Sequence, residues 1–462
     1  MKNINKPLLA IFLLSGHIAY SQTPVQIKGS FNTDNSSNVK LFKIERGDMK
    51  EIASTLPQVD SKFGFTFYPE YDGFYAIGTG NPENRTNNFV FYFKAGDQMD
   101  FVISKDGFDL IGNKNSKENQ VLAKWQRESR IVEGKSHNWM RIQSNFVDFF
   151  PDLEVLNEKS KNFPKENRSG NAKFDNILPT YIKWDIASSA TNFLNTPRTV
   201  HPSNEEYTEY YKTIDLIEYS KNASIVYNMP WGNRTLKGVE VVTKFIKNSP
   251  SVRGINSLKN DLEMYSNDTL KGDVVINYLA RQRDYSSYRE GIKNYGNLLI
   301  TSNQEKRASE IMTTMAQLKP GDEGLDFSFE DKEGKMVKFS DFKNKVVLID
   351  VWATWCGPCK EQIPYLKKLE EELKGKDIQI VSISVDVLKD KGKWSDMVKA
   401  QNLGGVQLFA SGWGEFTKYY KIQSIPRFMV FDKNGKIVTV NSPRPSSSEL
   451  KQLLEKLLSE KS

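Results

Sequence analysis

The sequence predicts a multidomain chain: an α/β domain at the C-terminus, preceded by a β-rich, sandwich-like domain and a mostly helical region. Two observations lead to this prediction. The chain has 462 residues, which is too long for one ordinary hydrophobic core. The spacing of its apolar residues also changes twice along the chain, from alternation to a helical period, and then to strands and helices in turn. A composition of 38% hydrophobic and 26% charged residues is typical of a globular protein.

The N-terminus has the layout of a secretory signal peptide. Lys2 and Lys6 give a positive start, residues 8–14 are apolar, and Ala19-Tyr20-Ser21 forms a small-residue cleavage site. A membrane anchor is the alternative, but the apolar run is far shorter than the ~20 residues that span a bilayer. No cysteine lies near the cleavage site, so we expect no lipid attachment of the bacterial lipoprotein kind. The sequence therefore predicts a signal peptide over residues 1–21, cleaved after Ser21, and export to the periplasm or cell envelope.

Residues 22–112 are expected to form the β-rich domain. Short runs of alternating apolar and polar residues follow one another there, separated by clusters of Gly, Asn, Asp and Pro. Strands at such regular spacing are typical of a sandwich or a small barrel. The runs are VQIKGSF, VKLFKI, FGFTFY, FYAIGT, NFVFYFKAG and MDFVIS.

Residues 113–318 are expected to be mostly helical, because their apolar residues recur near a spacing of 3.6. His137 and His201 fall in this region without a carboxylate or cysteine at catalytic spacing, so we assign both a structural role. The segments with the helical period are 181–193, 204–222, 238–248 and 307–319.

The α/β domain is expected over residues 319–462. Lys319-Pro320-Gly321-Asp322 stops a helix and turns the chain, which marks a boundary. Strands and helices then alternate, and the last two strands form an antiparallel hairpin. The expected elements are a hairpin in 327–342, a strand at 346–353, a helix at 359–375, a strand at 377–386, a helix at 390–402, a strand at 406–410, a short helix at 415–421, a hairpin in 426–440 and a helix at 447–458.

The chain has two cysteines, Cys356 and Cys359, and they lie three residues apart. Exported proteins commonly use cysteine pairs as staples, but closing so small a ring removes little chain entropy. A structural zinc site needs four ligands, and the histidines at positions 17, 137 and 201 are distant in sequence. We therefore expect no metal, and a dithiol that forms and breaks a disulfide reversibly.

The position of each thiol suggests its role. Cys356 begins a predicted helix, where free N–H groups and the helix dipole stabilise the attacking thiolate. Cys359 lies one turn further along and is expected to be less exposed, which suits the thiol that resolves a mixed disulfide. Gly357 lets another backbone approach closely, and Pro358 suits the first turn of a helix. Pro364 lies farther along and is expected to kink that helix.

Asp350 is a carboxylate in the otherwise apolar strand 346–353. Burial without a partner raises the pKa of a carboxyl group, and an acid with a raised pKa can accept and return a proton. We therefore expect Asp350 to take the proton of the resolving thiol. The alternative is an aspartate at an exposed strand end that is hydrogen-bonded to a loop.

Two motifs carry a resemblance to a known family. Trp355-Cys356-Gly357-Pro358-Cys359 after a strand, together with Ile425-Pro426 before FMVFD, resembles the thioredoxin superfamily. The stretches 352–364 and 320–345 are similar to the exported TlpA/ResA-like thiol-disulfide oxidoreductases. The resemblance covers about residues 319–462 and implies a thioredoxin-like fold for that domain.

The resemblance also implies roles for single residues. It makes Cys356 the nucleophile, Cys359 the resolving cysteine and Asp350 the buried proton-transfer acid. Pro426 falls at the cis-proline beside the active site, where the adjoining backbone pairs with a substrate chain. The other residues expected to contact substrate are Trp355, Gly357, Pro358 and Ile425. The redox-active pair Cys356–Cys359 is the reacting group, and no further cofactor is implied.

One position departs from the family, and a second is open. Many TlpA/ResA-like proteins carry a glutamate two residues before the helix proline, where this chain has Gln362, with Glu361 one place earlier. Arg427 follows the expected cis-proline. It either adds positive potential near Cys356 or is a solvated surface arginine.

The function expected from these features is an exported thiol-disulfide oxidoreductase that acts on protein substrates. The resemblance favours a reductant or isomerase recharged by a membrane thiol-transfer partner. A peroxidase of the same fold is an alternative, although the lone cysteine after Pro-x-x-x-Thr is missing. A second alternative is a cell-envelope binding protein with an accessory redox domain. The net charge of +7 is not gathered into one run, so nucleic acid is not an expected partner.

Overall fold

The computed structural model describes residues 23–460, apart from 33–36, 84, 105–106, 138–143, 199, 248, 250–251, 253, 283 and 317. The expected signal peptide, residues 1–21, lies outside the described residues. The chain divides into two compact units, of which the first holds residues 1–251 and 264–267, and the second holds residues 252–263 and 268–462.

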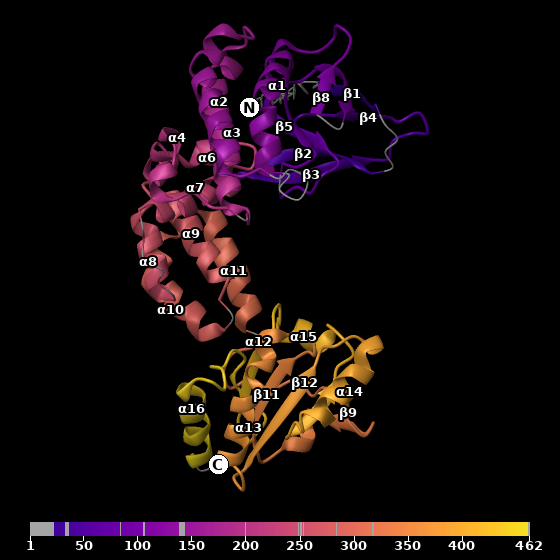
Figure 1. The fold of residues 1–462 in the computed structure, drawn as a ribbon, viewed down its shortest axis with the longest axis vertical. Coiled ribbons are helices and arrows are strands. Elements are labelled where there is room, and N and C mark those ends of the chain that lie inside the picture. The colour runs from indigo at the N-terminus through magenta and orange to yellow at the C-terminus, as the bar shows by residue number, and fades with distance from the viewer. Residues whose placement is uncertain are drawn as a thin grey trace, which may run out of the picture. The chain divides into compact units, whose positions relative to one another are not determined.

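The first unit opens with two four-stranded sheets, which appear in the indigo part of Figure 1. In one sheet the order is β4-β1-β7-β8, and in the other it is β3-β2-β5-β6. The strands are β1 (Val25–Phe31), β2 (Val39–Glu45), β3 (Asp48–Thr55), β4 (Lys62–Phe67), β5 (Gly73–Gly78), β6 (Asn88–Phe93), β7 (Gln98–Ser104) and β8 (Gly107–Leu110).

The two sheets share one hydrophobic core, as the strands of a sandwich do. Alternate residues of β1, such as Val25 and Ile27, are buried in the same cluster as Leu41 of β2 and Phe91 of β6. The prediction of a β-rich, sandwich-like part is confirmed. Strand β3 was not predicted: it is an edge strand with Met49 as its one buried residue, so its sequence lacks the alternation that reports a half-buried strand.

Helices follow the sandwich in the first unit, so the prediction of a helical middle region is confirmed. The segment 204–222, however, is not one helix. It forms three short pieces, interrupted before Thr208 and before Asp215. The helices of the unit are α1 (Lys117–His137), α2 (Phe146–Glu166), α3 (Ala172–Asn195), η1 (Asn204–Glu206), α4 (Glu209–Lys212), α5 (Leu216–Tyr219), α6 (Ala223–Asn228) and α7 (Gly232–Ile246).

A buried ionic contact joins the sandwich to these helices. Arg85, from the loop between β5 and β6, pairs with Asp185 of α3, and both side chains are almost fully buried. The indole N–H of Trp125 on α1 donates to the other carboxylate oxygen of Asp185 at 2.9 Å. A buried charge needs such partners, because removing one of them leaves the other uncompensated. The contact therefore holds the sandwich and helices α1 and α3 together.

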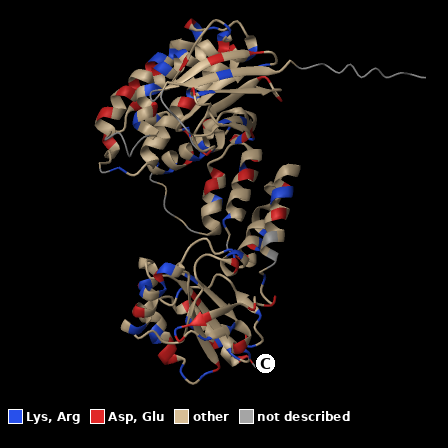
Figure 2. Cartoon of the chain, turned by 90° about the vertical axis from the view of Figure 1, so that its right-hand side faces the viewer, with Lys and Arg blue, Asp and Glu red and all other residues tan. Residues whose placement is uncertain are grey.

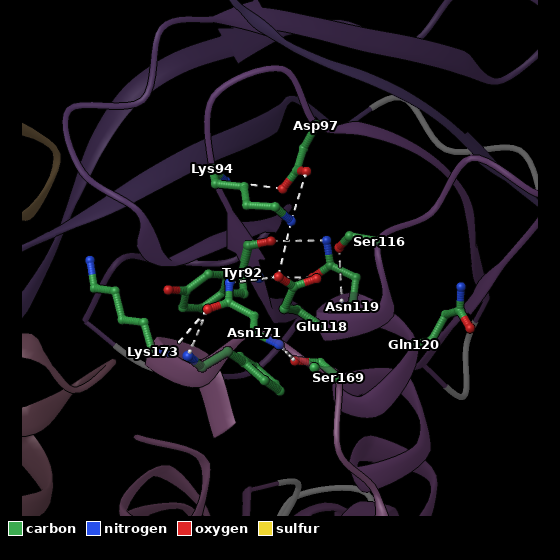
Figure 3. A network of polar contacts seen from close by, with 12 residues as sticks. Tyr92, Lys94, Asp97, Ser116, Glu118, Asn119, Gln120, Ser169, Asn171 and Lys173 are labelled. Atoms are coloured by element: carbon green, nitrogen blue, oxygen red, sulfur yellow. Dashed lines mark hydrogen bonds and ion pairs between the residues drawn. The ribbon is translucent and has the colours of Figure 1, made fainter. Parts of the chain in front are cut away.

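A second polar network links the same elements, and Figure 3 shows it at close range. Asn119 of α1 is fully buried, and its side chain accepts from the backbone N–H of Tyr92 at 2.8 Å and donates to the Tyr92 carbonyl at 3.0 Å. Asn119 thus pairs with edge strand β6 as a neighbouring strand would. Beside it, Glu118 accepts from Lys94 at 2.9 Å and from Asn171 at 2.7 Å.

The second unit begins with helices and ends with the α/β domain. Figure 2 colours Lys and Arg blue and Asp and Glu red, and the two colours are interspersed along the cartoon of the described residues. Across the ranges that the structure describes, no helix is both long and apolar enough to cross a bilayer. The leading helices of this unit are α8 (Ile255–Glu263), α9 (Asp268–Ala280), α10 (Tyr285–Tyr295), η2 (Gly296–Leu298) and α11 (Ser302–Ala316).

The α/β domain is built on a seven-stranded sheet of order β10-β9-β13-β12-β11-β14-β15. Strands β11, β12 and β13 are parallel, whereas β14 and β15 close the sheet in antiparallel fashion. Its strands are β9 (Ser328–Asp331), β10 (Met336–Lys338), β11 (Val346–Trp352), β12 (Ile378–Ser384), β13 (Val406–Phe409), β14 (Arg427–Phe431) and β15 (Ile437–Thr439). Its helices are η3 (Phe339–Phe342), α12 (Gly357–Lys360), α13 (Ile363–Glu372), η4 (Leu388–Asp390), α14 (Lys391–Ala400), α15 (Glu415–Tyr419) and α16 (Ser448–Ser459).

Helices cover both faces of this sheet. Leucines of α13 and α16 pack on the face that carries Val346 and Leu348 of β11. Residues of α14 and α15 pack on the opposite face, which carries Val347 and Ile349. Because both faces are covered, β11 has an apolar residue at nearly every position. The predicted α/β domain is therefore confirmed, with β11 at its centre.

Candidate active site

The central strand β11 leads directly into the predicted site. All seven of its residues are buried, and it lies between β12 and β14. After Trp352 the chain leaves the sheet at the carboxyl end of β11, and α12 begins a few residues later. In open α/β sheets, reactive groups gather at this edge.

Cys356 and Cys359 are joined by a disulfide. Cys356 is the N-cap residue of α12, and its sulfur accepts from the backbone N–H of Cys359 at 3.2 Å. Each cysteine is 4% exposed, so the prediction that Cys359 is the less exposed of the two is wrong. The disulfide holds both sulfurs in one small ring, and both residues pack in the same hydrophobic cluster.

The helix expected over residues 359–375 is divided. The short α12 ends at Lys360 and α13 begins at Ile363, with Pro364 in the first turn of α13. Pro364 therefore starts a helix, where its missing N–H costs nothing, and the prediction of a mid-helix kink is wrong.

The turn between α12 and α13 holds Glu361 and Gln362, the position that departs from the family pattern. Gln362 is buried, and its side-chain oxygen accepts from the backbone N–H of Ser446 at 3.2 Å. Glu361 is exposed. A buried amide, and not a carboxylate, thus occupies the family's glutamate position.

Asp350 lies inside the sheet, on the face that α13 covers. Its side chain is almost fully buried, and Oδ2 accepts from the Ser382 hydroxyl at 3.4 Å. Burial raises the pKa of Asp350 to about 7, and the hydrogen bond from Ser382 offsets part of the rise. The alternative of an aspartate at an exposed strand end is therefore wrong.

A small cavity brings Asp350 and Cys359 together. It has a volume of about 30 Å³, and its wall includes Asp350, Cys359, Ser382 and the α13 residue Leu366. A cavity needs at least about 10–15 Å³ to hold a water molecule. Asp350 and Cys359 therefore line one space that is large enough for a water molecule.

The peptide bond Ile425-Pro426 is cis, as the resemblance implies. Strand β14 starts at Arg427, which is in register with Val351 of β11. Pro426 therefore lies beside the carboxyl end of β11, where the loop to Cys356 begins. Ile425 is half-buried and packs against the cluster that holds both cysteines.

Arg427 is buried, with 3% of its surface exposed. Its guanidinium donates to the Val440 carbonyl at 3.1 Å and to the Asn441 side chain at 3.4 Å. The alternative of a solvated surface arginine is wrong. Its effect on the potential near Cys356 stays a prediction.

The surface beside the disulfide is open. Trp355 is 60% exposed, and Gly357 and Pro358 are also exposed. A side chain at position 357 would meet no atom within 4 Å, so a partner chain can approach this backbone. That these three residues contact substrate stays a prediction.

Asp386 is a site residue that our sequence reading did not identify. It follows β12 and is fully buried. One carboxylate oxygen accepts from the Thr354 backbone N–H at 2.9 Å and from the Ser384 hydroxyl at 2.7 Å, and the other accepts from the Thr354 hydroxyl at 2.8 Å. Asp386 thus anchors the loop that carries Trp355 and Cys356. The signal was present, because Asp386 is a carboxylate that follows the apolar run of β12.

We expect Asp386→Ala to destabilise the protein and to slow the reaction of Cys356. The substitution leaves three donors without their acceptor, and each buried unpaired group costs about 1–3 kcal/mol. Urea denaturation should show a loss of at least about 3 kcal/mol in the free energy of unfolding, and thiol alkylation should report a slower Cys356. The matched control is Asp377→Ala, an exposed carboxylate of the same domain, which should change stability by less than about 0.5 kcal/mol. Equal effects of both substitutions would contradict the anchoring role.

Comparisons with known proteins place the C-terminal domain in a family. Residues 319–455 match the family model described as Redoxin. Thiol-disulfide oxidoreductase ResA of Bacillus thuringiensis subsp. konkukian is 30% identical over 145 residues, which is 31% of this chain and 82% of that protein. ResA of Bacillus cereus is 31% identical over 137 residues, which is 30% of this chain and 78% of that protein. Among solved structures, a thiol-disulfide oxidoreductase of Bacteroides fragilis matches 29% of this chain and 99% of its own, with 29% identity and a TM-score of 0.26.

Proposed function

Through its C-terminal domain the chain belongs to the ResA-like thiol-disulfide oxidoreductases of the thioredoxin superfamily, and we propose that Cys356 and Cys359 exchange disulfides with protein substrates. The observation that carries the proposal is the disulfide at the start of α12, which shares a small cavity with the buried Asp350. The reacting group is the dithiol itself, and the absence of a further cofactor or metal stays a prediction.

In the proposed reaction Cys356 attacks first. Its thiolate, stabilised at the start of a helix, bonds to one sulfur of a substrate disulfide, and the other substrate sulfur leaves as a thiolate. The Cys359 thiol then gives its proton to the Asp350 carboxylate. The Cys359 thiolate attacks the Cys356 sulfur, and the bond from Cys356 to the substrate breaks. The substrate gains two electrons and the protein returns to its disulfide form.

We further propose that the protein acts as a reductant or isomerase of exported proteins. The Gly357-Pro358 pair between the cysteines lacks the histidine of strongly oxidising members. Each cycle leaves the protein oxidised, so a donor must return two electrons. A membrane thiol-transfer protein is the partner that an exported reductant requires, and the N-terminal signal peptide would bring the chain to it.

Insulin reduction tests the proposal. With dithiothreitol as donor, the wild-type protein should speed reduction of the insulin disulfides far above a Cys356→Ser variant, because that variant lacks the attacking thiol. The redox potential tests the direction: a value near −270 mV supports a reductant, and one near −120 mV supports an oxidant. A wild-type protein no faster than Cys356→Ser would refute the proposed activity.

A further inference from the structure

Three polar side chains lie in one row across the centre of the sheet. Asp350 of β11 is in register with Ser382 of β12, and Ser382 is in register with Gln407 of β13. Positions in register on neighbouring parallel strands point to the same face, which here is the face that α13 covers. All three side chains are at least nine-tenths buried. Apolar residues surround the row, so its polar character needs an explanation.

Gln407 is the member of the row that the proposed function does not use. Its side-chain N–H donates to the Gly404 carbonyl at 2.6 Å. Its oxygen, Oε1, is buried and has no hydrogen-bond partner among the described residues. A buried acceptor left unpaired costs about 1–3 kcal/mol, so such groups are normally satisfied by protein or by water.

Gln407 lines the same cavity as Asp350 and Cys359. Its volume of about 30 Å³ is enough for a water molecule, and a buried water needs two to four polar partners. Asp350, Ser382, Gln407 and Cys359 all line the cavity and carry groups that can bond to a water. The cavity is therefore roomy enough for a bound water, and polar residues stand among the apolar ones that line it.

We propose that Gln407 is a positioning residue whose Oε1 holds a water molecule in this cavity, and that this water carries the proton between the Cys359 thiol and the Asp350 carboxylate. The inference rests on the proposed function. In the step, the Cys359 thiol gives its proton to the water as the water gives one of its own to Asp350. A thiolate and a carboxylic acid form, and the water is regenerated. Gln407 accepts a hydrogen bond from the water and itself transfers no proton.

Uncharged strand residues and two charged residues of α13 surround Asp350. Its neighbours on β12 and β14 are Ser382 and Phe428, neither of which is charged. From α13, Lys367 and Glu370 line the same cavity. Lys367 donates to the Gln401 carbonyl, and Glu370 accepts from the backbone N–H of Gly405 at 2.7 Å. Both charged groups are thus engaged with the loop before β13.

Reaction of the reduced protein with an aromatic disulfide tests the proposal. Each of the two cysteine attacks releases one coloured aromatic thiolate. The first release reports attack by Cys356, and the second reports attack by Cys359. In Gln407→Met, which removes the acceptor and keeps an unbranched side chain, we expect the second release to be roughly tenfold slower, since positioned proton transfer contributes at least that much. The first release should stay within about twofold. The pH profile of the second release should also change, which a purely structural loss would not cause.

The matched control is Gln379→Met on β12. Gln379 is half-buried, lies on the opposite face of that strand from Ser382, and donates to the Ile380 carbonyl. The Gln379→Met substitution should leave the rates of both thiolate releases unchanged. If Gln407→Met does not fold, Gln407→Asn keeps the amide one carbon shorter and should slow the second release by about threefold. Equal slowing of both releases, or no change in a folded variant, overturns the role of Gln407. Failure of the wild-type protein to give either release instead refutes the proposed function.

Discussion

Asp350→Asn is expected to make the protein more stable above pH 7. Burial raises the pKa of Asp350 from 3.8 to about 7, so above that pH the folded protein holds a carboxylate that would be better solvated in the unfolded chain. A difference of this size corresponds to about 4 kcal/mol, at ~1.4 kcal/mol for each tenfold change in affinity for the proton. Asparagine has nearly the same shape and no charge to bury.

The pH dependence has a defined sign. Between pH 3.8 and about 7 the folded state binds the proton of Asp350 and the unfolded state does not. Stability from this group therefore falls as pH rises through that window, and is constant above it. Urea denaturation at pH 4 and at pH 8 should show a gain for Asp350→Asn at pH 8 alone. The exposed Asp377→Asn is the control, and a gain of equal size at both pH values would contradict the prediction.

The same substitution should slow the enzyme. Without a carboxylate to accept its proton, the Cys359 thiol must give that proton to solvent. Loss of a positioned base costs about 10²–10⁴-fold in rate. In the wild-type protein the second step should rise with pH through about 7, as Asp350 becomes able to accept a proton. That rise should disappear in Asp350→Asn. A gain in stability paired with a loss of rate would show that burial of this acid has been retained for function.

Cys359→Ser is expected to stop turnover and to trap the substrate. Cys356 remains at the start of α12 and can still attack a substrate disulfide. The mixed disulfide then persists, because no second thiol lies within reach to resolve it. The chain has no other cysteine that could take over this role.

Trapping is measured on non-reducing gels, with mass spectrometry of the covalent complex. The wild-type protein should show little complex, and Cys356→Ser none. A dithiothreitol wash should release the substrate from Cys359→Ser. Complex formation that is equal in Cys356→Ser and Cys359→Ser would contradict the assignment of Cys356 as the nucleophile. The identity of the trapped proteins would also name the natural substrates.

Much of the α/β domain could be predicted from local patterns. Strand β11 is an apolar run because helices cover both faces of the central sheet, and such a run is visible in the sequence. The hairpin of β14 and β15 was visible from Lys433-Asn434-Gly435, whose residues favour a turn. Edge strand β3 was not visible, because one buried residue gives no period.

The errors share a cause. Pro364 was expected to kink a helix, but α12 ends four residues earlier, at Lys360, and the turn that follows holds buried Gln362, which accepts from the backbone of Ser446, more than eighty residues away in sequence. The sequence left open whether Arg427 lies near Cys356 or is solvated at the surface. Contacts with the segment after β15 bury its side chain. In each case a contact between distant segments decided the outcome, and local sequence holds no record of such a contact.

The sequence by itself determined the chemistry of this protein. A dithiol three residues apart at a helix start, and an acid in an apolar strand, follow from residue type and spacing alone, because thiolate stability and the cost of burying a charge are local properties. The tertiary structure alone decided which groups support that chemistry. Asp386 reaches the loop before Cys356, and Gln407 reaches the cavity beneath Cys359, because parallel strands far apart in the sequence lie side by side in the sheet. Strand order and register come from packing of the whole domain, so the partners of these two residues become recognisable only after it has folded.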